Sequence, residues 1–133
     1  MKKTYRGSCH CGAVRFETDI DLSEGTWKCN CTICTKARLW HSVVKPEEFR
    51  LLAGESELSE YQFHTRALHH LFCKHCGVHV FGWGEAPEIG RFYTPKLNCL
   101  DDVDLNALVH APVFFVDGRN DNFKAPPAEV RHL

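Results

Sequence analysis

The chain has 133 residues, 44% of them hydrophobic, and a formal net charge of −1, since 16 Lys and Arg side chains balance 17 Asp and Glu side chains. So small a charge creates no long-range field for nucleic acid or an anionic membrane, and no apolar run approaches the roughly 18 residues that cross a bilayer. The length indicates a single domain, residues 1–133, with a sizeable hydrophobic core.

The eight cysteines have two interpretations, the disulfides of a secreted protein or the ligands of a metal. The basic first residues are not followed by an apolar stretch, so they do not predict a signal peptide. The cysteines follow C-x-C and C-x-x-C spacings, which favour metal ligation by thiolates. We therefore expect a reducing, cytoplasmic compartment and no disulfides.

Short strands are predicted along the first half of the chain. Alternating apolar and polar residues predict a half-buried strand over residues 13–18, and Pro46 ends another. Residues 32–38 are expected to form one or two helical turns, with Cys34 near the first turn, where the helix dipole favours a thiolate. The strands predicted here are residues 3–8, 13–18, 39–45, 49–51 and 58–63.

The second half continues in the same way. Predicted strands cover residues 70–72, 78–83 and 90–98, and an apolar run at residues 112–116 ends in a turn at Asp117. A short helix is expected to begin within residues 100–105. Short strands, frequent glycines and little helical periodicity together predict a mainly β domain.

Two cysteine pairs have similar local sequences. Cys9 and Cys11 precede Gly12, Cys76 precedes Gly77 three residues after Cys73, and a phenylalanine follows each glycine by four residues. Residues two apart in a flat strand lie too far apart to share a metal, so Cys9–Gly12 is expected to be a turn with positive φ at Gly12. Four thiolates complete a tetrahedral zinc site, so these pairs predict one structural zinc between the early and the late chain.

The segment of residues 29–34 carries three further thiols, Cys29, Cys31 and Cys34. Three protein ligands and an open position are typical of a catalytic zinc. A fourth protein ligand would close the site, and Cys99 is the first candidate, ahead of His41 and His75. Leucines at positions 97 and 100 favour the alternative that Cys99 is simply a buried apolar cysteine.

An open zinc with three thiolates has a predictable chemistry. The complex carries a charge of −1, so it should acidify bound water less than three neutral imidazoles do. Such a site suits the binding of another thiolate, and a metal-held thiolate beside a carbonyl group is a means of carbon–sulfur bond formation. Arg119, which follows the turn at Asp117, is a candidate for binding a substrate carboxylate.

Three segments together resemble the glutathione-dependent formaldehyde-activating enzyme family, which also includes centromere protein V. They are Gly7–Phe16, Cys29–Cys34 and Phe72–Gly77, and the later residues 98–104 and 117–119 resemble the C-terminal part of the family. The resemblance covers about residues 5–123. It implies a β-tent fold of short antiparallel sheets tied by a zinc site between two knuckle hairpins.

The resemblance also implies two zinc ions and a reaction. A structural zinc is expected on Cys9, Cys11, Cys73 and Cys76. A catalytic zinc is expected on Cys29, Cys31 and Cys34. The implied activity is that of a carbon–sulfur lyase, which joins glutathione and formaldehyde into S-(hydroxymethyl)glutathione. The expected partners are thus a small thiol and an aldehyde, not nucleic acid or a membrane.

Two other hypotheses stay open at the level of sequence. A non-catalytic zinc-binding module would dock a protein partner, with Trp27, Trp40 and Trp83 as candidates for its interface. A redox or metal-sensing protein would use the thiols at positions 29–34 without permanent zinc. A fourth protein ligand at the second metal would favour the binding module.

Overall fold

Nine strands and two α-helices follow one another in the computed structural model, which describes residues 1–133. The strands are β1 (Lys3–Ser8), β2 (Arg15–Ile20), β3 (Thr26–Cys29), β4 (Phe49–Ala53), β5 (Leu58–Tyr61), β6 (Leu68–Cys73), β7 (His79–Ala86), β8 (Gly90–Pro95) and β9 (Val113–Val116). The helices are α1 (Thr32–Ala37) and α2 (Leu105–His110). The predicted mainly β fold is confirmed.

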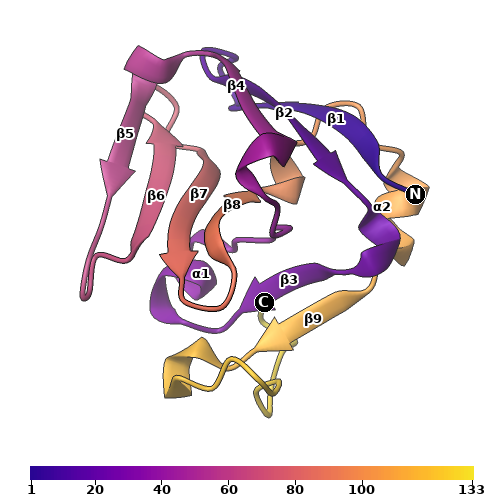
Figure 1. The fold of residues 1–133 in the computed structure, drawn as a ribbon, viewed down its shortest axis with the longest axis vertical. Coiled ribbons are helices and arrows are strands. Elements are labelled where there is room, and N and C mark those ends of the chain that lie inside the picture. The colour runs from indigo at the N-terminus through magenta and orange to yellow at the C-terminus, as the bar shows by residue number, and fades with distance from the viewer.

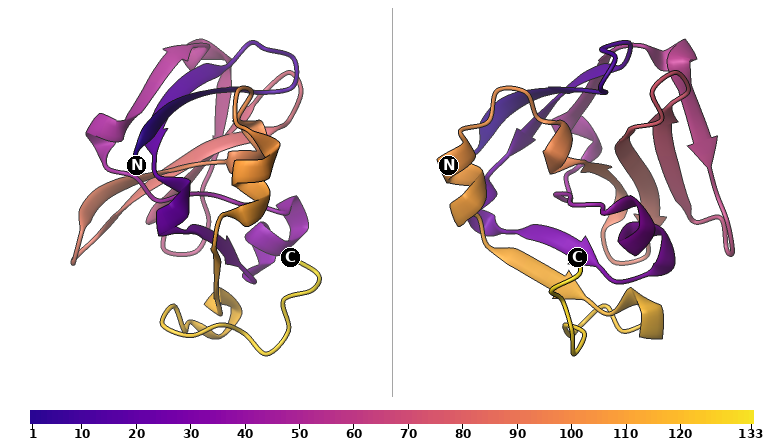
Figure 2. Two further views of the ribbon diagram at one scale, coloured as in Figure 1. Left: turned by 90° about the vertical axis from the view of Figure 1, so that its right-hand side faces the viewer. Right: turned by 180° about the vertical axis from the view of Figure 1, so that it is seen from behind.

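Three small sheets surround a common interior (Figures 1 and 2). One has the order β1-β2-β4, the second pairs β3 with β9, and the third has the order β5-β6-β7-β8. The first and third are antiparallel throughout, whereas β3 and β9 run parallel. None of the helices is long and apolar enough to cross a membrane.

Phe49, at the start of β4, ties the two antiparallel sheets together. Its ring packs on Phe16 of β2 with 5.4 Å between centroids, on Phe81 of β7 at 4.5 Å and on Tyr93 of β8 at 5.1 Å. Phe16 and Phe81 are buried as well. Aromatic side chains bury large apolar areas, so this stack contributes to the hydrophobic core between the two sheets.

The parallel pair was not predicted. Residues 26–28 lead directly into the cysteines, and no short-range signal links them to residues 113–116. In the structure Cys29 lies opposite Val116, and the backbone N–H of Asn30 continues the contact by donating to the carbonyl oxygen of Val116 at 3.3 Å. The late chain is thereby fixed beside the three-cysteine segment.

One predicted strand is absent. Residues 39–45 form no strand, because only His41 and Val44 make isolated bridges, to Trp27 and Lys96 and to Tyr93. The helix expected to begin within residues 100–105 begins at Leu105, the last residue of that range, because the Asp104 side chain accepts a hydrogen bond from the backbone N–H of Asn106 and caps it there. The helix after the cysteines, α1, agrees with the prediction.

Candidate metal centre

The turns between β1 and β2 and between β6 and β7 have closely similar backbones. The N–H of Cys9 donates to the carbonyl of Val14 at 3.1 Å, and the N–H of Cys73 donates to that of Val78 at 3.0 Å. Gly12 has φ +82° and Gly77 has φ +77°. Glycine adopts this left-handed conformation without strain, which explains why Cys-Gly recurs in both turns.

These two turns bring four sulfur atoms together. Cys11 Sγ lies 3.6 Å from Cys9 Sγ and 3.6 Å from Cys73 Sγ, and all four sulfurs, with Cys76, lie within 4.8 Å of one another. Sulfurs at roughly 2.3 Å from a tetrahedral zinc are separated by roughly 3.8 Å, so the group fits this ion. Cys9 and Cys73 are buried, whereas Cys11 is exposed.

The second group consists of Cys29, Cys31 and Cys34, whose sulfurs also lie within 4.8 Å of one another. Cys29 ends β3, Cys31 caps α1 and Cys34 lies in its first turn. The carbonyl oxygen of Cys31 accepts from the N–H of Thr35 at 2.9 Å, and that of Cys34 accepts from the N–H of Leu39 at 3.0 Å. The structure thus has two cysteine clusters that could each hold a metal ion, which is consistent with two zinc sites.

The three thiols of the second group influence one another's ionisation. Hydrogen bonds from Cys29 and Cys34 lower the pKa of Cys31. Hydrogen bonds with Cys29 and Cys31, together with burial, raise the pKa of Cys34, which does not agree with the thiolate expected there from the helix dipole. A divalent cation would favour the thiolate form of all three.

None of the three candidates for a fourth protein ligand joins these sulfurs. Cys99 is buried, its sulfur lies 3.3 Å from the carbonyl oxygen of His79, and burial raises its pKa to about 12. His75 is exposed and its Nε2 lies 2.6 Å from Glu57 Oε2. His41 pairs with Trp27, two residues before Cys29, but does not belong to the group.

Residues 116–119 cover the second group through Asn30, a residue that sequence reasoning missed. The Asn30 side chain donates to Asp117 Oδ1 at 2.7 Å and accepts from the N–H of Arg119 at 2.9 Å. A Cβ at Gly118 would lie only 2.5 Å from Cys29 Sγ. The absent side chain therefore lets this segment lie directly on the sulfurs.

Three cationic residues come from segments next to the second group. The guanidinium of Arg119 donates to the carbonyl oxygen of Asn30 at 3.1 Å. The ammonium of Lys28 donates to the carbonyl oxygen of Leu133 at 3.2 Å, and the guanidinium of Arg38 donates to that of His132 at 3.4 Å. Arg119 is therefore the cation that contacts the cysteine segment itself.

The three tryptophans do not form one surface. All are half-buried, and each packs on its own partner. Trp27 packs on Phe114 with 5.1 Å between centroids, and the indole N–H of Trp40 donates to Thr26 Oγ1 at 2.8 Å. Trp83 stacks on His69 at 3.6 Å. This arrangement gives no support to a shared aromatic interface.

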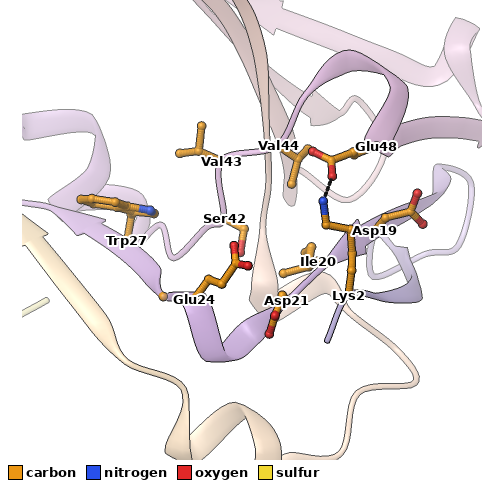
Figure 3. Close-up of a pocket in the computed structure, with 11 residues that line it drawn as sticks. Lys2, Asp19, Ile20, Asp21, Glu24, Trp27, Ser42, Val43, Val44 and Glu48 are labelled. Atoms are coloured by element: carbon orange, nitrogen blue, oxygen red, sulfur yellow. Dashed lines mark hydrogen bonds and ion pairs between the residues drawn. The ribbon is translucent and has the colours of Figure 1, made fainter. Parts of the chain in front are cut away.

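A hollow beside β2 and β3 is a separate feature, and no cysteine lines it (Figure 3). Its acidic side chains are largely paired within the chain. Lys2 forms an ion pair with Glu48, and Asp19 binds Arg50 at 2.8 Å. These pairs stabilise the surface and leave little charge for a ligand.

Comparison with known proteins gives two findings. Residues 4–115 match the family described as "Glutathione-dependent formaldehyde-activating enzyme". The fold is also similar to the crystal structure of a Rhodobacter sphaeroides protein, with 26% sequence identity and a TM-score of 0.69 over 82% of this chain and 99% of that one. The family match, over residues 4–115, includes the residues of both cysteine clusters.

Proposed function

Because the chain belongs to the glutathione-dependent formaldehyde-activating enzyme family, we propose that it is a zinc-dependent carbon–sulfur lyase-type enzyme. It adds a thiol such as glutathione to formaldehyde or another small aldehyde, and residues 1–133 act as one domain. The observation that carries the proposal is a group of three sulfurs that no fourth protein ligand joins.

The two clusters take different roles in this proposal. Cys9, Cys11, Cys73 and Cys76 hold a structural zinc. Cys29, Cys31 and Cys34 hold a catalytic zinc. When bound at the second cluster, zinc supplies a position at which a substrate thiolate binds and becomes available to a carbonyl carbon.

Cationic residues of the neighbouring segments suit an anionic thiol. Glutathione carries two carboxylates, and Lys28, Arg38 and Arg119 come from segments next to the second cluster. Arg119 is already oriented by Asn30, which reduces the entropy lost when a carboxylate binds. The same positive charges favour the thiolate over the thiol.

Exchange NMR with the zinc-loaded protein, glutathione and ¹³C-formaldehyde tests the proposal. The rate of exchange between free formaldehyde and the hemithioacetal should rise in proportion to protein concentration. Cys31→Ser should abolish this increase. Cys99→Ala is the matched control, because it removes a buried thiol outside both clusters, and it should keep the increase.

The uncatalysed reaction is the reference for this experiment. An exchange rate that the protein does not change, with glutathione or with any other small thiol, would overturn the proposal. Zinc counting should accompany the kinetics, with two ions per chain in the wild-type protein and one in Cys31→Ser.

A further inference from the structure

Lys96 is a buried cation without a carboxylate partner. Lys96 is only 3% exposed, and its ammonium donates only to Thr94 Oγ1, at 3.3 Å. It takes part in none of the ion pairs of the structure. Burial lowers its pKa to about 8. A buried charge costs several kcal/mol unless something compensates it, so its position needs an explanation.

Three histidines each have a buried ring nitrogen without a partner, and the backbone places two of them next to Lys96. His41 pairs with Lys96 in an isolated bridge, and the N–H of Lys96 donates to the carbonyl of Val80, next to His79. His41 Nδ1, His70 Nε2 and His79 Nδ1 are buried and form no hydrogen bond. Burial lowers the pKa of all three, so they are neutral and each ring has one N–H donor.

The backbone places this group next to the second cysteine cluster. His41 pairs with Trp27, two residues before Cys29, and with Lys96. The N–H of Leu39, two residues before His41, donates to the carbonyl oxygen of Cys34 at 3.0 Å.

Charge balance alone accounts for only part of this arrangement. One ammonium near the thiolates would offset the negative charge of a three-thiolate metal complex. The unpartnered imidazole nitrogens remain unexplained, since buried polar groups are normally hydrogen-bonded. Such nitrogens would form hydrogen bonds to a small polar ligand atom that binds beside the second cysteine cluster.

We propose that Lys96, His41 and His70 form a site beside the second cysteine cluster that binds the oxygen of the aldehyde while a thiol adds to its carbon. This inference rests on the proposed function and assigns it further residues. The ligand class is an aldehyde small enough to place its oxygen in the protein interior.

The groups of this site donate and accept every proton that the reaction needs. The thiolate sulfur donates an electron pair to the carbonyl carbon, the carbon–sulfur bond forms, and the π electrons of the carbonyl group move to the oxygen. The ammonium of Lys96 transfers a proton to this alkoxide, which becomes the hydroxyl group of the hemithioacetal. The neutral amine then takes the proton that the next thiol releases, so thiol and aldehyde combine without an oxidant or reductant.

Lys96→Met tests the inference in the zinc-loaded protein, because methionine keeps the length of the buried chain without its charge. The exchange rate with glutathione and formaldehyde should fall about 100-fold, the usual effect of losing one oxyanion donor. Zinc content and the calorimetric Kd for glutathione should stay within about two-fold of wild type, since binding of the thiol does not use this donor.

Formate serves as a second, non-catalytic probe, because it is a small ligand with a negatively charged oxygen. Its Kd should rise at least about ten-fold in Lys96→Met. His70→Gln should lower the exchange rate about ten-fold and weaken formate binding, and it tests the site if Lys96→Met does not fold. Lys3→Met, at an exposed position of β1, is the control for a lost charge and should match wild type.

Two results overturn the inference alone. One is a Lys96→Met protein with wild-type exchange and wild-type formate binding. The other is a variant that loses zinc or glutathione affinity in step with activity, which would make Lys96 a counter-ion of the sulfurs. A wild-type protein that does not accelerate exchange overturns the proposed function and this inference together.

Discussion

Asn30, between the first two cysteines of the second cluster, donates its side-chain amide to Asp117 Oδ1 at 2.7 Å, although 87 positions separate the two residues. The same side chain accepts from the N–H of Arg119 at 2.9 Å. Asn120 and then Asn30 donate to the carboxylate and lower the pKa of Asp117, so it is charged at neutral pH. One buried amide thus joins the cysteine segment to the chain that covers it.

Asn30→Ala should destabilise the zinc-loaded protein by about 2 kcal/mol. The variant loses two side-chain hydrogen bonds, one of them to a charged group, and leaves the N–H of Arg119 without its acceptor. Urea unfolding followed by tryptophan fluorescence measures the change. Asn98→Ala, at an exposed position, is the control and should leave the stability within about 0.5 kcal/mol of wild type. Equal destabilisation by both would contradict the role given to Asn30.

Cys73→Ser should destabilise the fold far more strongly. Cys73 is fully buried and belongs to the cluster that joins the β1–β2 turn to the β6–β7 turn. Structural zinc contributes on the order of 10 kcal/mol to small domains, so losing one ligand should lower the melting temperature by well over 10 °C. Calorimetry of the variant and of chelator-treated wild type checks this. An unchanged melting temperature after zinc removal would show that the cluster has no structural role.

The cysteine clusters could be predicted because the information that specifies them is local. A C-x-C or C-x-x-C spacing followed by glycine determines a turn, and two such turns with matching residues predict one shared site. From the sequence, Cys99 could be either a fourth metal ligand or a buried cysteine of the hydrophobic core. The structure places it in the core, where its sulfur contacts the carbonyl oxygen of His79.

Features that depend on long-range pairing could not be predicted. No local pattern shows that β3 pairs with β9, so the cover over the second cluster and the role of Asn30 were missed. Lys96 lies within residues 90–98, which the sequence predicts as a strand, whereas β8 ends at Pro95. Its burial follows only from its neighbours across the chain, His41 and Val80. Charged residues are rarely buried, so nothing in the sequence distinguished this lysine from an exposed one.

Gly118→Ala should empty the second cluster and leave the first intact. The added methyl group would lie 2.5 Å from Cys29 Sγ and 3.3 Å from Cys31 Cβ, so the sulfur or the covering segment must move. Zinc per chain should fall from two towards one, and the exchange activity should fall with it. Elemental analysis after extensive dialysis provides the measurement.

Gly90→Ala is the matched control for this change. Gly90 has φ +74°, so alanine is strained there, but its Cβ would meet no atom within 4 Å. The control should lose about 1 kcal/mol of stability and keep both zinc ions. If it lost zinc as Gly118→Ala does, general destabilisation would explain the loss.

Asp19 provides a test of pH dependence away from the metal clusters. Hydrogen bonds from Arg50 and then from Thr4 lower its pKa from 3.8 to about 2. A carboxylate with a depressed pKa in the folded state contributes stability above its unfolded pKa and loses it as pH falls to the folded value. The stability difference between wild type and Asp19→Asn should therefore be full above about pH 4 and shrink towards pH 2.

The magnitude of this difference should be modest. The Arg50 side chain is 38% exposed, so solvent screens the pair and the full difference should be about 1 kcal/mol or less. Comparing the two proteins at each pH removes the effect of zinc release in acid, which both share. Urea midpoints at pH 6, 4 and 3 provide the measurement. A difference that grew as the pH fell would mean that the carboxylate is not stabilised by Arg50 in its charged form.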